Sequence, residues 1–153
     1  MNMQTDSRIT TVITTDPTEN EWRKLFALTG HWQSDLQFFS DELDFLRTLV
    51  DKHFSTLMRE EHIESTKSTV SQLGKLENRR SNFEQKISRH YHHLAALIED
   101  PFPHDAQTYR EEHQKLEAAM ADFVKDFRQV KRAVFQLTKE VMDGERTGHL
   151  LAR

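Results

Sequence analysis

Histidine and carboxylate residues at interior positions of long helical segments are the residues of this chain best suited to bind a metal ion. His90 and His113 fall on otherwise apolar repeats, and Glu42 and Glu117 flank such repeats. Imidazole nitrogens and carboxylate oxygens are ligands for Zn, Fe or Mn, and helical bundles build such sites from inward-facing side chains. The candidate metal ligands are therefore Glu42, His90, His113 and Glu117.

The predicted turns between helices bring these side chains to one level. A turn centred near residue 65 places His90 opposite residues 40–42 of the first helix. A second turn centred near residue 102 places His90 opposite His113. His93 and Asp35, one helical turn further along, form a second tier of candidates.

Known metal-binding patterns do not occur among these residues. Glu-x-x-His, the pattern of di-iron bundles, is absent, and so is His-Glu-x-x-His. The favoured interpretation is therefore structural: His90 and His113 are buried, hydrogen-bonded and set the register of the helices. Metal binding is the alternative.

Three long segments must position these side chains, and each carries an apolar repeat whose steps alternate three and four residues. This repeat is typical of helices that pack side by side. Pro17 suits a first helical turn, Pro101 and Pro103 end a helix, and Gly144 suits the position after a C-terminus. The predicted segments are a tail at 1–16, helices at about 17–62, 68–99 and 105–143, and a tail at 145–153.

Helices of similar length with short connections predict an all-α fold, an up-down-up bundle of three coiled-coil-like helices. The first turn is assigned to Ser65–Ser68, because the repeat changes phase there and these residues favour turns. One continuous helix from Pro17 to Glu99 is the alternative. Arg80, at an interior position, is expected to pair with Asp122 or Asp126.

The first predicted helix carries more apolar surface than one contact needs. Phe38 and Phe45 lie a heptad apart, off the main repeat, with Leu49 beside them. A second apolar stripe of this kind must be covered, and a symmetric homodimer is the commonest solution. Trp22 is a further candidate for contact with a partner. The alternative for the stripe is a core wide enough to cover it. For Trp22 the favoured interpretation is cover from within the chain, by Phe102.

Composition narrows the function. The chain has 153 residues, a net charge of −4 with histidine neutral, and no cysteine, which excludes thiolate metal sites and cysteine nucleophiles. No apolar run predicts a membrane span or a secretory signal. Basic residues on the third helix face an acidic counterpart at Asp41 and Asp44 of the first. We predict a cytoplasmic, non-enzymatic helical bundle that binds a protein or itself, with no nucleic-acid or membrane partner and no cofactor; the alternative is a bundle that binds Zn, Fe or Mn.

Overall fold

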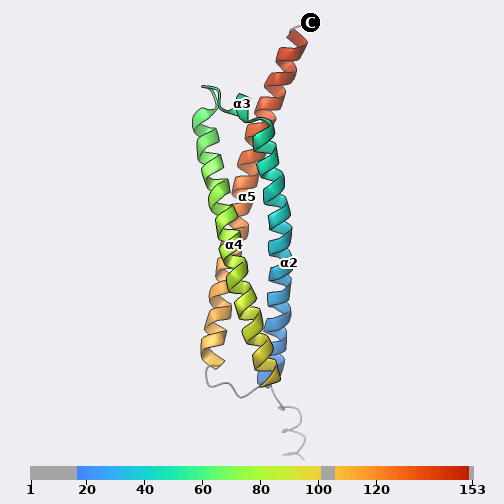
Figure 1. The fold of residues 1–153 in the computed structure, drawn as a ribbon, viewed down its shortest axis with the longest axis vertical. Helices are drawn as coiled ribbons and strands as arrows, with labels where there is room; N and C mark the ends of the chain where they lie inside the picture. Colours follow the sequence, from blue (N-terminus) through green and yellow to red (C-terminus); the bar gives the residue numbers. More distant parts are fainter. Residues whose placement is uncertain (1–16, 101–105, 152–153) are drawn as a thin grey trace, which may run out of the picture.

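Helices make up nearly all of the part of the chain that the structure, a computed structural model, describes: residues 17–100 and 106–151. Those two ranges contain no β-strand, so the predicted all-α class is confirmed. The helices in chain order are α2 (Pro17–Lys52), α3 (Phe54–Leu57), α4 (Ile63–Glu99) and α5 (Ala106–Leu151). The three long ones lie side by side (Figure 1). Neither α2, α4 nor α5 contains a stretch apolar enough to cross a membrane. The predicted tail at residues 1–16 lies outside the described residues.

The apolar repeat of the sequence forms one core that all three long helices share. Phe39 of α2 joins the helices, because its ring centroid lies 5.4 Å from that of Phe123 and 4.7 Å from that of Phe127 on α5. The most deeply buried members of this core are Leu36, Leu46, Leu73, Ile87 and Val134. A smaller cluster lies near the start of α2, where Trp22 packs with Leu94 and Leu97.

Contacts between α2 and α4 pair late residues of one helix with early residues of the other. Arg47 forms an ion pair with Glu77, and the ring of Phe26 stacks on that of Tyr91 with centroids 4.2 Å apart. The two helices therefore run in opposite directions.

Contacts between α4 and α5 follow the same rule. Arg79 donates a hydrogen bond to Asp126 at 2.7 Å. The sequence had suggested that Arg80 would take this partner or Asp122, and this was wrong: Arg80 bonds Glu84 one turn along its own helix, at 3.0 Å. Arg79 lies at the edge of the contact between α4 and α5 and reaches Asp126. Arg80 occupies a position of the apolar repeat and bonds within its own helix.

Along α5, polar contacts with the first part of the chain show how α2 and α5 are oriented. Three polar contacts join residues that lie 89 positions apart: Glu21–Arg110, Glu42–Lys131 and Thr56–Glu145. Their positions in the first part of the chain are separated by 21 and 14 residues, which are whole numbers of heptads. A constant offset means that α2 and α5 run in the same direction.

The first turn lies earlier in the chain than the sequence suggested. α2 ends at Lys52, the short α3 follows, and α4 begins at Ile63, so both the predicted turn at Ser65–Ser68 and the alternative of one continuous helix are wrong. The hydroxyl of buried Thr66 donates to the carbonyl oxygen of Leu57 at 2.8 Å. The serine- and threonine-rich segment therefore forms the start of α4 and bonds back to the end of α3, which would otherwise carry an unpaired carbonyl.

The last helix continues past its predicted end. α5 runs through Gly144 to Leu151, whereas the sequence suggested an end at residue 143 and a tail from 145. A glycine inside a helix costs only about 1 kcal/mol relative to alanine. Such a cost is small enough for α5 to continue into Glu145 and Arg146, which favour helix.

Candidate functional site

His90 is the centre of a polar cluster between α4 and α5. Its side chain is fully buried, with 0% exposure. Its Nδ1 lies 2.6 Å from Oε1 of Glu112, and its Nε2 lies 3.0 Å from Nδ1 of His113. Both ring nitrogens therefore have a partner on the facing helix.

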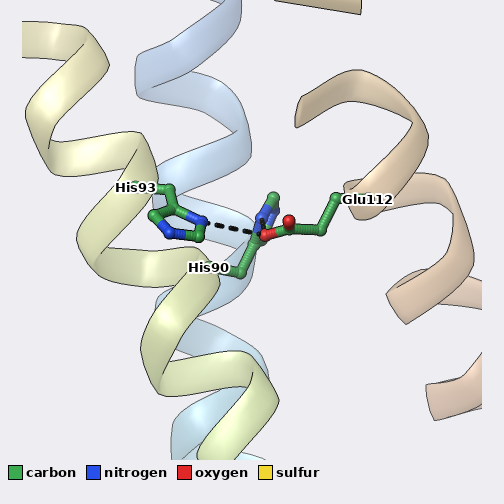
Figure 2. Close-up of side chains that lie close together, drawn as sticks. All are labelled: His90, His93 and Glu112. Carbon is green, nitrogen blue, oxygen red and sulfur yellow. Dashed lines mark hydrogen bonds and ion pairs between the residues drawn. The ribbon is translucent and has the colours of Figure 1, made fainter. Parts of the chain in front are cut away.

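His93 joins the same carboxylate from one turn further along α4. Side chains three positions apart on a helix share one face, and His93 Nδ1 lies 3.2 Å from Glu112 Oε1. Figure 2 shows both rings on α4 directed at the Glu112 carboxylate on α5. One nitrogen of each ring and one oxygen of Glu112 lie within 4.8 Å of one another. We call His90, His93, Glu112 and His113 the histidine–glutamate cluster.

α2 closes the cluster with an aromatic ring. The indole of Trp32 stacks on the ring of His113, with centroids 4.6 Å apart, and His113 is 4% exposed. Nε2 of His113 is buried without a hydrogen-bond partner among the described residues. The nearest carboxylate oxygen is Oε2 of Glu117, 4.0 Å away on a largely exposed side chain.

The hydrogen bonds assign the protons on the two buried rings. A carboxylate only accepts, so His90 carries its proton on Nδ1 and donates it to Glu112. Its Nε2 then accepts a proton from Nδ1 of His113, and Nε2 of His113 is left as an unpaired acceptor. Burial lowers the pKa of both His90 and His113 below the ordinary histidine value, against the opposing effects of Glu112 and Glu117. Both rings are therefore neutral near pH 7.

Glu112 connects the cluster to solvent. Its side chain is one-third exposed and lines a cleft of about 560 Å³ between α4 and α5. Lys86, Arg89, Glu111 and Lys115 also line this cleft. The Glu112 carboxylate is therefore accessible from solvent through the cleft.

Of the predicted metal ligands, the structure brings His90 and His113 together, with His93 of the second tier beside them. Glu117 lies at the edge of the cluster. Glu42 lies elsewhere, where it accepts a hydrogen bond from Lys131 at 2.7 Å, and Asp35 is exposed on α2. The early turn explains the difference, because it places Trp32 rather than Glu42 at the level of the histidines.

Sequence reasoning did not single out Glu112. The residue lies next to His113 and just off the apolar repeat, at the edge of the helix contact rather than inside it. Edge positions of coiled coils commonly carry the charged residues that pair between helices. Matching the edge positions of α4 and α5 would have paired Glu112 with His93.

The predicted interaction residues divide into two groups. Phe38 and Phe45 are 57% and 52% exposed on α2. Leu49 is half-buried against the main core. Trp22 is fully buried, and the guanidinium carbon of Arg110 lies 5.5 Å from its ring centroid. Trp22 is therefore covered from within the chain, as the favoured interpretation of the sequence expected, and is not an exposed anchor. The predicted cover, Phe102, lies outside the described residues.

Comparisons with protein families, with curated proteins and with solved structures find no match for this chain.

Proposed function

We propose that this protein is a non-enzymatic, up-down-up three-helix bundle that functions by self-association, as a symmetric dimer in which α2 of each copy packs on α5 of the other. The main support is the pair of exposed phenylalanines Phe38 and Phe45. They lie one heptad apart on the outer face of α2. Large apolar side chains repeated along one face of a helix are typical of interaction surfaces. We call these two residues the α2 stripe.

A second exposed apolar pair on α5 supports the same arrangement. Phe135 and Met142 are 41% and 52% exposed and also lie one heptad apart; we call them the α5 stripe. Lys131 connects the two stripes, since its Nζ bonds Glu42 on α2 and lies 5.6 Å from the ring centroid of Phe135. The two stripes therefore flank the same side of the contact between α2 and α5.

Charge complementarity favours a second copy of this chain as the partner. Exposed Asp41 and Asp44 accompany the α2 stripe. Exposed basic residues surround Phe135 on α5: Arg128, Arg132 and Lys139. A two-fold axis would bring the α2 stripe and its aspartates in each copy against the α5 stripe and its basic residues in the other, so the same favourable contact forms twice.

A charge exchange tests the dimer directly. In one variant Asp41 and Asp44 are changed to lysine, and in the other Arg128 and Arg132 are changed to glutamate. In a dimer of either variant alone, both contacts between α2 and α5 would bring like charges together. Each variant should therefore sediment with the mass of one chain. An equimolar mixture opposes unlike charges in both halves and should sediment at twice that mass.

The matched control reverses charges away from both stripes. Glu64→Lys with Asp122→Lys changes exposed acidic residues on α4 and α5 and should leave the dimer intact. An unmodified protein that sediments as a single chain at tens of micromolar would refute the proposal. So would a mixture of the two charge variants that stays monomeric while each variant is folded by circular dichroism.

A further inference from the structure

We propose that His90, His93 and Glu112 bind one divalent transition-metal ion, between α4 and α5 and independently of the dimer contact. Their donor atoms already converge: one nitrogen from each ring and one carboxylate oxygen lie within 4.8 Å of one another. Figure 2 shows the two rings and the carboxylate approaching from facing helices, with Glu112 between them.

The distances suit a small ion after minor adjustment. Zinc lies about 2.0–2.1 Å from nitrogen and oxygen ligands, so neighbouring tetrahedral ligands are separated by about 3.3 Å. The carboxylate oxygen is now 2.6 Å from His90 Nδ1 and 3.2 Å from His93 Nδ1. Rotation of the Glu112 side chain, which is only partly buried, can open the shorter distance.

The donor set defines the class of ion. Two neutral imidazoles and one carboxylate bind Zn, Fe(II) or Mn(II), and three protein ligands leave at least one coordination position open. Of the three ligands, Glu112 also lines the cleft between α4 and α5, together with Lys86 and Arg89. Water or a small anion could complete the coordination from the cleft.

His113 supplies the outer support that a metal-bound histidine requires. A metal on Nδ1 of His90 displaces the proton from that nitrogen, so the neutral ring carries its proton on Nε2 instead. That Nε2–H donates to Nδ1 of His113, 3.0 Å away, and the proton of His113 moves to its own Nε2. Each ring keeps one proton, and the nitrogen of His113 that lacks a partner becomes a donor.

Glu117 is the acceptor for that new donor. Its Oε2 lies 4.0 Å from His113 Nε2, and its exposed side chain is free to approach. Metal binding would therefore connect the ion to Glu117 through His90 and His113, in the manner of the carboxylate–histidine–metal arrangements of known sites. The buried unpaired nitrogen of His113, which otherwise has no structural explanation, then has a role.

Titration with Co²⁺ tests the site, followed by displacement with Zn²⁺, on full-length protein that carries no histidine tag and has been treated with a chelator. We expect one equivalent of Co²⁺ with visible absorption bands that Zn²⁺ abolishes. His93→Gln and Glu112→Gln should each weaken binding at least tenfold, because each removes one ligand. Both residues are partly exposed, so both variants should fold, which circular dichroism would verify.

His92→Gln is the matched control, since His92 is an exposed neighbour on α4 outside the cluster. It should bind Co²⁺ as the unmodified protein does. Failure to bind one equivalent, or binding that His93→Gln and Glu112→Gln leave unchanged, would overturn the proposal. The dimer tests are unaffected by either result, because the metal ligands lie between α4 and α5.

Nitrogen-15 NMR of the histidine rings tests the outer support. On addition of Zn²⁺ the proton of His90 should move from Nδ1 to Nε2, and that of His113 should follow. Glu117→Gln should weaken Zn²⁺ binding several-fold while leaving the three ligands intact. A bound ion with unchanged protonation of His113 would contradict the role of His113 and Glu117.

Discussion

Nε2 of His90 and Nδ1 of His113 are joined by a 3.0 Å hydrogen bond between α4 and α5, inside an otherwise apolar seam. Each ring occupies a position that the neighbouring turns fill with leucine or isoleucine, as at Ile87 and Leu116. The hydrogen bonds that join His90 to His113 and to Glu112 form only in one register of the two helices. A slip of one turn would leave these polar groups buried without partners, which costs free energy.

Replacing His90 or His113 alone should lower the free energy of unfolding by more than half of the amount lost when both are replaced. His90→Leu or His113→Leu leaves a buried polar partner unpaired, at a cost of about 1–3 kcal/mol. The double variant His90→Leu/His113→Leu removes both rings and should cost less than the sum of the two single changes. Urea denaturation of the four proteins measures the coupling. Strict additivity would mean that the two rings do not depend on each other.

Stability should fall as the solution is acidified below the ordinary histidine pKa. Burial lowers the pKa of His90 and His113 in the folded state, although Glu112 and Glu117 oppose the effect, and His93 near His90 acts in the same direction as burial. Below pH about 6.5 the unfolded chain therefore binds protons that the folded chain does not. The unfolding free energy should decrease by at most about 1.4 kcal/mol per pH unit for each ring, until the folded rings also titrate.

Urea denaturation between pH 5 and pH 8 checks this dependence. The double variant His90→Leu/His113→Leu should lose the acid sensitivity, whereas His92→Gln, which changes an exposed histidine, should retain it. A midpoint that stays constant from pH 8 to pH 5 in the unmodified protein would contradict the assignment of neutral, buried rings.

The sequence predicted the all-α class from the apolar repeat. It predicted the meeting of His90 with His113 from the helix break expected at Pro101 and Pro103, which lie outside the described residues.

The sequence predicted Glu42 as the α2 residue that meets the histidines, whereas the residue found there is Trp32. The error arose because no glycine or proline marks the first turn. Thr66, which the sequence assigned to that turn, instead donates a hydrogen bond to the carbonyl oxygen of Leu57 in the preceding helix. Such a bond depends on the packed structure and leaves no local signal.

The carboxylate of the cluster was missed for a different physical reason. Reasoning from the buried seam selects residues that point at the helix axis of a neighbour, and Glu112 lies beside that line. The ionic contacts between helices follow the same rule, since Arg79 and Asp126 lie two heptads from His93 and Glu112 at equivalent edge positions. The edge positions, as well as the seam, therefore carry the polar residues that pair between α4 and α5.

Trp22 and Phe38 should respond to substitution in opposite ways, because one is buried and the other is exposed. Trp22→Ala should destabilise the folded chain by about 3–5 kcal/mol, the usual cost of removing a large buried aromatic side chain. Phe38→Ala should change the stability of a single chain by no more than about 0.5 kcal/mol. Both are best measured by urea denaturation in the Arg128→Glu/Arg132→Glu background, where dimerisation does not contribute. Equal losses of unfolding free energy would contradict the burial of Trp22 and the exposure of Phe38.

Gly144 distinguishes a continuous α5 from a helix that ends near residue 143. Nothing lies within 4 Å of a Cβ added at this position, and the helix continues to Leu151. Gly144→Ala should therefore stabilise this part of α5 by up to about 1 kcal/mol through helix propensity alone. Slower amide hydrogen exchange around Val141 and Glu145 would report the change. If Gly144 instead ended the helix in a left-handed conformation, alanine would be strained there and exchange would become faster.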